Sequence, residues 1–421
     1  MGRIRFTRSV ATGGLAVTAA AIVALAACND LGAAPKTYTM PGDAIFSGDI
    51  DGDGDLDLMT GGGDGYDFAL NDGNGDFTPS YVDGHSDFSH MVLADVNSDT
   101  RQDMINLIYS GGDPENGIPE SFHLETKLSN GDGTFQDPTM VGTTGLVPDD
   151  HGSIAITAAN VNSDAWPDVV LYKSGTGVTA SVEVFMGSGA NSFLPAVVTP
   201  TSTKIFRAGM LGHSGLAVAD MNRDGKKDLV VAGWGEWPGD EFSRGQIAVL
   251  DGNGAGGFTA THSYATPAGT SSRAVGPGIG DFNEDGRLDV VAADVFDVGG
   301  GPESLTFWFG QASGLLGSPV TRAAKGETDT DLAVADVNGD HHLDVVTVAH
   351  LSSDDLNGSA WLMEGDGAGN ISSSIQLAAP TGYNGQHGGI VVRDLNADGK
   401  PEVAVSNGID KATVFPNALT S

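Results

Sequence analysis

The sequence predicts an all-β chain folded as one seven-bladed β-propeller of four-stranded blades. Two observations predict this fold. An aspartate-rich nonapeptide recurs seven times, beginning at residues 49, 95, 160, 220, 281, 336 and 394, and short apolar runs and glycine-rich turns accompany the copies. Units of this size are modules of one larger object rather than separate domains. Four strands in each of seven units are typical of blades arranged around a central channel.

The fourth unit shows the expected strands most clearly. Gly215–Ala219 leads into the nonapeptide, Leu229–Ala232 leaves it, and Gln246–Leu250 follows after a polar insert. After the turn Asp251–Gly257, the segment Phe258–Tyr264 alternates with period two. This pattern predicts four short strands and no helix. The apolar strand that enters each nonapeptide is expected to be innermost and buried on both faces.

The last unit lacks its fourth strand. After Ala412–Phe415 the sequence ends at Ser421, whereas Lys36–Met40 near the N-terminus has strand character and no unit of its own. We therefore expect Lys36–Met40 to pair beside Val414 and close the ring, which would remove two open sheet edges.

The nonapeptides carry oxygen side chains at positions 1, 3, 5 and 9. Alternate side chains of a tight loop converge on one ion, and position 7 can add a backbone carbonyl, which is the arrangement that Ca²⁺ prefers. We predict up to seven calcium sites. The predicted ligands are Asp49, Asp51, Asp53, Asp57, Asp95, Asn97, Asp99, Asp103, Asn160, Asn162, Asp164, Asp168, Asp220, Asn222, Asp224, Asp228, Asp281, Asn283, Asp285, Asp289, Asp336, Asn338, Asp340, Asp344, Asp394, Asn396, Asp398 and Glu402.

Position 6 ranks these loops, because glycine tolerates a positive φ there. The second, third and sixth loops carry Thr100, Ala165 and His341 instead, so we expect weaker sites in them. The third is the poorest, since Asn160 and Asn162 replace two carboxylates. EF-hands would need flanking helices and a glutamate at position 12. Dockerin-like repeats would be much shorter, and simple hydrophilic turns would not repeat seven times with an acid at position 9.

The composition describes an acidic, turn-rich chain. It has 62 glycines and a net charge of −35, while 40% hydrophobic residues suffice to build a core. Binding nucleic acid requires clustered Lys and Arg, so we expect no nucleic-acid partner. We expect a monomer.

Residues 1–27 are predicted to be a signal peptide. Arg3, Arg5 and Arg8 precede the apolar stretch Leu15–Ala27, and the only cysteine, Cys28, follows. Leu25–Cys28 resembles the lipobox of bacterial lipoproteins, which implies a lipid anchor at Cys28, residues 28–36 as a linker and a propeller over residues 37–421. An ordinary signal peptide is the alternative. The predicted location is the bacterial cell envelope, outside the cytoplasm, at the outer membrane or cell surface.

The nonapeptide, its flanking strands and the glycine-rich turn with phenylalanine together resemble FG-GAP repeats, also classed as VCBS repeats. Such repeats form the blades of integrin α-subunit heads and of many bacterial exported proteins. The resemblance implies that each loop joins the innermost strand to the second strand and binds its own calcium ion. It specifies fold and metal more closely than activity.

The candidate ligand face lies opposite the metal loops, where the longer inserts between second and third strands carry Tyr109, Trp234, Trp237, Phe296 and His350. Scaffolded loops with aromatic residues suit a protein or glycan ligand, so we expect an adhesion or recognition scaffold. No nucleophile elbow, zinc-protease motif or P-loop is present in the sequence. A polysaccharide lyase or hydrolase and a structural envelope component remain the alternatives.

Overall fold

The computed structural model describes most of the chain from residue 34 onward. The described residues are 34–42, 44–62, 65–83, 88–110, 121–145, 153–174, 180–201, 205–206, 215–235, 244–267, 272–296, 304–324, 328–349, 359–377, 388–407 and 410–416. The predicted signal peptide and Cys28 lie outside them. No helix among these residues has the length and apolarity needed to cross a bilayer.

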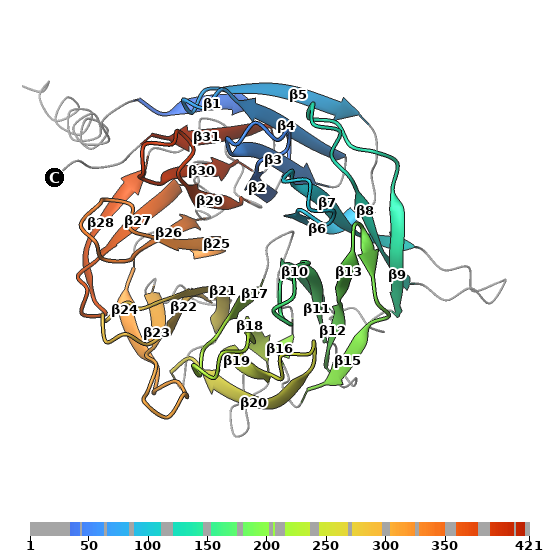
Figure 1. The fold of residues 1–421 in the computed structure, drawn as a ribbon. Coiled ribbons are helices and arrows are strands. Elements are labelled where there is room, and N and C mark those ends of the chain that lie inside the picture. Colours follow the sequence, from blue (N-terminus) through green and yellow to red (C-terminus); the bar gives the residue numbers. More distant parts are fainter. Residues whose placement is uncertain are drawn as a thin grey trace, which may run out of the picture.

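Seven antiparallel sheets surround a common centre, as Figure 1 shows, and this confirms the predicted seven-bladed β-propeller. The first three blades contain β2 (Ala44–Gly48), β3 (Asp57–Gly62), β4 (Gly65–Asn71) and β5 (Phe77–Asp83); β6 (Phe88–Ala94), β7 (Asp103–Ser110), β8 (Ser121–Lys127) and β9 (Thr139–Gly145); and β10 (Ser153–Ala159), β11 (Asp168–Ser174), β12 (Ser181–Phe185) and β15 (Val197–Pro200). A separate hairpin of β13 (Gly187–Gly189) and β14 (Ser192–Phe193) precedes β15.

The remaining blades follow the same order. They contain β17 (Leu216–Ala219), β18 (Asp228–Gly235), β19 (Arg244–Gly252) and β20 (Phe258–Ala265), with β16 (Ile205–Phe206) added beside β18; β21 (Ser272–Gly280), β22 (Asp289–Phe296), β23 (Ser304–Trp308) and β24 (Val320–Ala323); β25 (Thr328–Ala335), β26 (Asp344–Ala349), β27 (Ser359–Gly365) and β28 (Ile371–Leu377); and β29 (Ile390–Arg393), β30 (Glu402–Ser406), β31 (Lys411–Phe415) and β1 (Lys36–Thr39).

The strand β1 is the outermost strand of the seventh blade. It pairs antiparallel with β31, with Lys36 opposite Val414. The blade therefore contains strands from both ends of the described chain.

The prediction that the innermost strands are buried on both faces holds only in part. Ile154, Ala155 and Ile156 of β10 are buried in succession, whereas β17 is mostly half-buried. In the fourth blade only Leu216 of β17 is buried, whereas nearly every residue of the second strand, β18, is buried. The physical reason is position, because β17 has a pairing partner on one side only, whereas β18 is covered by strands on both edges. The apolar innermost runs instead cover the inner edge of the blade.

Hydrophobic packing joins each blade to the next. Seven clusters of buried side chains each combine residues of two neighbouring blades; for example, Val231 of the fourth blade packs with Val182 of the third. One cluster joins the two ends of the chain, since Ile45 and Leu58 of the first blade pack with Ala404 and Val414 of the seventh. The core is thus divided among the interfaces between blades.

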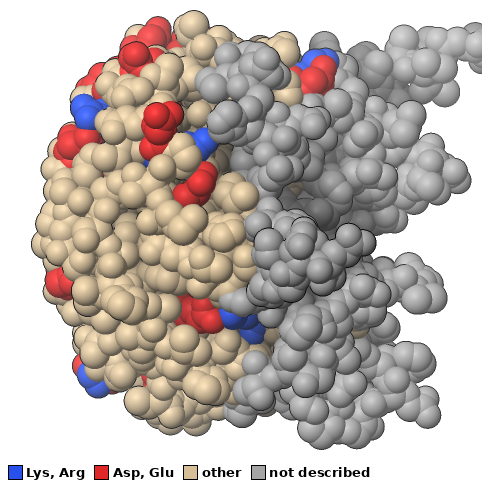
Figure 2. All heavy atoms as spheres, turned by 90° about the vertical axis from the view of Figure 1, so that its right-hand side faces the viewer, with Lys and Arg blue, Asp and Glu red and all other residues tan. Residues whose placement is uncertain are grey.

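The outer wall formed by the second and third blades carries few charges. Figure 2 views that side and shows scattered acidic and basic side chains on a largely uncharged surface. Met140 of β9 and Val198 of β15 are exposed at 65% and 54%. The acidic excess therefore lies largely elsewhere, and the nonapeptide loops account for much of it.

Candidate metal loops

All seven nonapeptides fold into loops that share one set of internal hydrogen bonds. The N–H of position 5 donates to the side-chain oxygen of position 3 at 2.9 to 3.2 Å in every loop. The N–H of position 7 donates to the carboxylate of position 5 at 2.7 to 3.0 Å. These bonds are Asx turns, which short oxygen-bearing side chains favour. The loop shape is therefore encoded locally.

Position 1 closes the turn in six of the loops. Its carboxylate accepts the N–H of position 6 at 2.7 to 3.1 Å. Thr100 and His341 adopt positive φ values of 77° and 74° at position 6, so the second and sixth loops have the same backbone as the glycine-bearing loops. The third loop differs, because Ala165 has no positive φ there and the Asn160 amide donates instead to the carbonyl of Asp164.

Position 4 also adopts a positive φ in all seven loops, which sequence reasoning missed. The residues concerned are Gly52, Ser98, Ser163, Arg223, Glu284, Gly339 and Ala397, with φ between 54° and 84°. Only two of them are glycines, so composition gave no signal. The surrounding hydrogen bonds hold the other five in a conformation that costs about 1 kcal/mol or more outside glycine.

The acid at position 9 connects the loop to the blade. It is almost completely buried, and one of its oxygens accepts the N–H of position 2 at 2.7 to 3.0 Å in all seven loops. In six loops the other oxygen accepts an N–H at the glycine-rich turn, also at 2.7 to 3.0 Å. Glu402 of the seventh loop accepts the side-chain amide of Asn396 instead. Position 9 therefore has a structural role besides any metal binding.

Burial raises the pKa of several of the acids at position 9. It raises the pKa of Asp57 to about 7 and the pKa of Asp103, Asp289 and Asp344 to about 6, although backbone N–H donors oppose the effect. Desolvation disfavours the charged form of each carboxylate. A bound cation would offset this cost.

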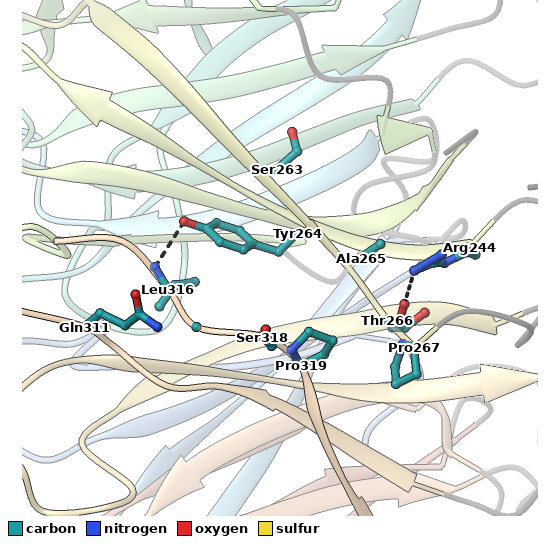
Figure 3. A pocket seen from close by; sticks show the side chains of 11 residues that line it. Arg244, Ser263, Tyr264, Ala265, Thr266, Pro267, Gln311, Leu316, Ser318 and Pro319 are labelled. Carbon is teal, nitrogen blue, oxygen red and sulfur yellow. Dashed lines mark hydrogen bonds between the residues drawn. The ribbon is translucent and has the colours of Figure 1, made fainter. Parts of the chain in front are cut away.

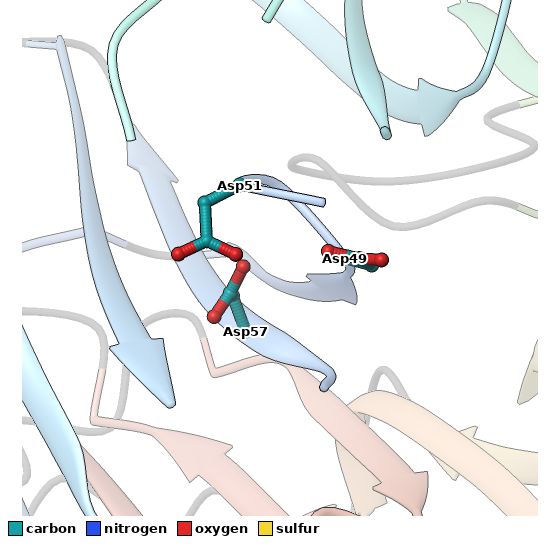
Figure 4. Close-up of side chains that lie close together, drawn as sticks. All are labelled: Asp49, Asp51 and Asp57. Atoms are coloured by element: carbon teal, nitrogen blue, oxygen red, sulfur yellow. The ribbon is translucent and has the colours of Figure 1, made fainter. Parts of the chain in front are cut away.

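Only the first loop brings three acidic side chains together, among the His, Cys, Asp and Glu residues that the structure describes. Asp49, Asp51 and Asp57 each offer an oxygen within 4.8 Å of the others, and Figure 4 shows Asp51 and Asp57 facing one another with Asp49 to one side. Position 7 of this loop is Asp55, so no basic side chain within the nonapeptide neutralises the group. Three convergent carboxylates fit a hard divalent cation such as Ca²⁺.

Basic residues at position 7 alter three other loops. Lys226 pairs with Asp224 at 3.0 Å, Arg287 with Asp285 at 2.5 Å, and Arg101 with Asp99. Each pair engages the position 5 carboxylate that was predicted to bind metal. The residue at position 6, by which the loops were ranked, does not reveal this competition for the position 5 carboxylate.

Hydrogen bonds also join a metal loop to the following blade. In three loops the acceptor is the main-chain carbonyl of position 2. The carbonyl of Ile50 accepts the Ser129 hydroxyl (2.5 Å), that of Val96 accepts the Asn191 N–H (2.8 Å), and that of Phe282 accepts the Gly369 N–H (2.9 Å). At the junction of the last and first blades, the Asn71 amide donates to the Leu395 carbonyl at 2.6 Å. The conformation of a loop is thus coupled to the packing of its neighbour.

The candidate ligand face is only partly placed by the structure. Trp234 lies half-buried in β18, opposite Gly245 of β19 and Phe206 of β16. The backbones of Tyr109 and Phe296 lie in β7 and β22, while Trp237 and His350 fall outside the described residues. The five aromatic and histidine positions therefore remain a prediction.

The repeats match a known family. Residues 220–292 and 281–347 match the family model described as FG-GAP-like repeat. These residues of the fourth to sixth blades therefore contain FG-GAP-like repeats, and together with the seven four-stranded blades they support an FG-GAP repeat β-propeller. No curated protein shows significant sequence similarity to the chain.

Several solved structures are similar to the chain at low sequence identity. The crystal structure of the exotype rhamnogalacturonan lyase YesX has a TM-score of 0.50 and 13% identity, covering 91% of this chain and 73% of that one. Rhamnogalacturonan lyase PL11 from Bacillus licheniformis has a TM-score of 0.45 and 13% identity, covering 93% and 73%. A triple mutant of AofleA from Arthrobotrys oligospora has a TM-score of 0.42 and 8% identity, covering 82% and 90%. At 13% identity the similarity to YesX concerns the fold alone.

Proposed function

We propose that this protein is an exported, lipid-anchored recognition scaffold whose propeller binds calcium. The observation that carries the calcium proposal is the first loop, where Asp49, Asp51 and Asp57 converge within 4.8 Å. Mutual repulsion among three carboxylates, one of them fully buried, makes the ion-free loop unfavourable. A divalent cation supplies the missing positive charge.

The other loops have donor sets of different quality for the same ion. Each keeps an oxygen side chain at positions 1, 3, 5 and 9, and six of the seven share the hydrogen bond between positions 1 and 6. The third loop, with Asn160 at position 1 and a different backbone at position 6, has the weakest set. We propose a graded series of sites, with the first the strongest and the third the weakest.

The proposed role of the ions is structural. Extracellular calcium modules bind with Kd of about 10⁻⁴ to 10⁻³ M. At 1 mM calcium, a site with a Kd of 0.1 mM would stabilise the folded state by about 1.4 kcal/mol. Because the chain has one cysteine, intramolecular disulfides cannot supply this rigidity. The ligand loops require a rigid scaffold, and the bound ions would provide it.

Recognition is the proposed activity of the scaffold, with a protein or a glycan as partner. The support is the fold, which presents loops on a face opposite the metal loops, and the proposed export and anchoring at Cys28. The alternative is polysaccharide cleavage, since the fold is similar to that of a rhamnogalacturonan lyase. At 13% identity no catalytic residue can be transferred from that enzyme, so recognition remains the better supported activity.

Calcium titration calorimetry tests the metal proposal. We expect Asp51→Ala to remove the tightest binding event, while Asp132→Ala, which changes an exposed acid in a glycine-rich turn, leaves it unchanged. Equal calcium isotherms for the three proteins would refute the assignment of the first loop. A screen of glycans and surface proteins with and without calcium tests recognition: calcium-dependent retention without bond cleavage supports the scaffold, and release of cleaved polysaccharide supports the enzyme.

A further inference from the structure

The metal loop with three convergent carboxylates is held from outside by the second blade. The Gln102 N–H donates to the main-chain carbonyl of Asp49 at 2.7 Å, and the Ser129 hydroxyl donates to that of Ile50 at 2.5 Å. Both donors belong to the second blade, and both acceptors stand at the first two positions of the first loop. The backbone that carries the predicted ligand Asp49 is therefore fixed by a neighbouring blade.

Arg101 extends this contact to position 4 of the first loop. Its main chain forms position 7 of the second loop, but its side-chain methylene groups lie against Gly52. A Cβ atom placed on Gly52 would lie 2.9 Å from the Cγ and 3.2 Å from the Cδ of Arg101. Glycine at this position leaves room for the arginine. The methylene groups of Arg101 thus cover the turn between the predicted ligands Asp51 and Asp53.

The guanidinium group of Arg101 keeps the side chain in this place. One of its amino groups donates to the carboxylate of Asp99, at position 5 of the second loop. The side chain is 31% exposed, and its Nε has no hydrogen-bond partner among the described residues. Because both ends of the side chain are fixed in the second loop, its middle remains over Gly52. One residue therefore contacts two neighbouring metal loops.

We propose that Arg101 is a positioning residue of the first calcium site, although it belongs to the second loop. By covering Gly52 it restricts the turn that carries Asp51 and Asp53, so less conformational entropy is lost when calcium binds. Calcium in the second loop would compete with the guanidinium group for Asp99 and loosen this cover, which links the two sites. The inference rests on the proposed calcium function and adds a residue from outside the first nonapeptide.

Arg287 provides a matched comparison, because it occupies position 7 of the fifth loop. It pairs with Asp285 at 2.5 Å, as Arg101 pairs with Asp99. Its Nε, however, donates to the carbonyl of Gly310 at 2.9 Å, so its described hydrogen bonds remain within the fifth blade. A change at Arg287 removes the same charge from the same loop position and leaves the first loop untouched.

Calcium calorimetry with two pairs of variants tests the role of the methylene groups. Arg101→Met keeps an unbranched chain over Gly52 and Arg101→Ala removes it, while both variants lose the same charge. We expect the tightest binding event, which Asp51→Ala assigns to the first loop, to be about threefold to tenfold weaker in Arg101→Ala than in Arg101→Met. Arg287→Ala and Arg287→Met are the control pair, and their tightest events should agree within about twofold.

Hydrogen exchange in EDTA gives a second readout that requires no calcium. The amides of Gly52 and Gly54 donate to the Asp49 carboxylate at 2.7 and 3.1 Å, and these hydrogen bonds should open more often when the turn is uncovered. We expect faster exchange of residues 49–57 in Arg101→Ala than in Arg101→Met, with residues 281–289 unchanged. Arg101→Lys, which keeps both the chain and the charge, should match the unchanged protein, and melting curves establish that each variant is folded.

Weaker binding and faster exchange in Arg101→Ala together support the proposal. Equal affinity in Arg101→Ala and Arg101→Met, or equal exchange of residues 49–57, overturns it. Equal tightening in both variants also overturns it, since Arg101 would then act on the first loop through its charge alone. If Asp51→Ala retains the tightest event, the assignment of calcium to the first loop fails, and the exchange measurement in EDTA still decides whether Arg101 positions that loop.

Discussion

The side chain of Asn71 donates a 2.6 Å hydrogen bond to the main-chain carbonyl of Leu395, which joins the first blade to the last across 324 residues of sequence. The same amide group donates to the carbonyl of Leu56 at 2.9 Å, and its oxygen accepts the N–H groups of Gly73 and Gly75. One buried asparagine thus holds a glycine-rich turn, its own metal loop and the neighbouring blade.

The substitution Asn71→Ala should destabilise the protein strongly. It leaves two buried carbonyls without this partner and releases the turn, so we expect a loss of about 2–4 kcal/mol in the free energy of unfolding. Urea unfolding measures it, with the exposed Asn74→Ala in the same turn as control, for which we expect less than about 0.5 kcal/mol. Similar losses for the two variants would show that the contact between blades contributes little.

The acid at position 9 should matter even without metal. In the fourth loop, Asp228 accepts N–H groups from Met221 at 2.9 Å and Gly252 at 2.8 Å. Asp228→Asn replaces one acceptor by a donor that faces an N–H, so we expect a loss of about 2–3 kcal/mol in EDTA. Asp224→Asn in the same loop retains its acceptor for the Lys226 N–H and should cost less than about 1 kcal/mol. If both variants unfold at the same urea concentration in EDTA, position 9 has no separate structural role.

Lys226 should weaken calcium binding in the fourth loop. Its ammonium group lies 3.0 Å from Asp224, and a cation at this place competes with a metal ion. An exposed ion pair is worth up to about 1 kcal/mol, so Lys226→Gln should tighten calcium binding about twofold to fivefold at low salt. Lys227→Gln removes the same charge one residue further on, where no ion pair with Asp224 is lost. If calorimetry finds the same calcium affinity in both variants, the ion pair with Asp224 does not compete with the metal, and Lys226 acts only through its long-range charge.

Asp294 should give a measurable pH dependence. Burial raises its pKa to about 6, while the hydroxyls of Thr306 and Ser304 donate to its carboxylate at 2.6 and 2.8 Å and partly oppose the effect. The folded state therefore binds more protons than the unfolded state between about pH 4 and pH 6, and stability falls as the pH rises through that window.

Comparing Asp294→Asn with the unchanged protein isolates this contribution. Between pH 4.5 and pH 7.5 we expect the variant to gain about 2 kcal/mol in unfolding free energy relative to the unchanged protein. Urea unfolding at the two pH values, with calcium held constant, measures the difference, and other titrating groups contribute equally to both proteins. A difference independent of pH would mean that Asp294 is charged throughout this range.

Most of the fold could be predicted from the sequence repeat. The predicted strands of the fourth unit agree with β17 to β20, and the segment predicted to pair beside Val414 does so through Lys36. These features follow from local periodicity and from an unpaired strand at the end of the chain. The burial of the innermost strands was not predictable in the same way, because the hydrophobicity of β17 resembles that of β18 and only the ring geometry separates them.

The residues of the metal loops could be predicted from the sequence, but the hydrogen bonds that join these loops to the rest of each blade could not. Spacing identified the loops, yet the double hydrogen bond of each position 9 acid joins segments about 14 to 26 residues apart and depends on the blade. The basic residues Arg101, Lys226 and Arg287 stand at position 7 in the sequence, but spacing alone does not show that they pair with the position 5 carboxylate. The hydrogen bond from the Leu316 N–H to the Tyr264 hydroxyl (Figure 3) left no sequence signal, since the two residues belong to different blades.

Thermal unfolding of the propeller in 1 mM calcium and in EDTA tests the central claim most directly. If the loops hold structural ions, several sites of about 1.4 kcal/mol each are lost in EDTA, and the melting temperature should fall by at least about 5 °C. Readdition of calcium should restore it, while magnesium should restore it less, because Mg²⁺ dehydrates reluctantly and demands a tighter octahedral site. A melting temperature that is identical in calcium and EDTA would contradict the account.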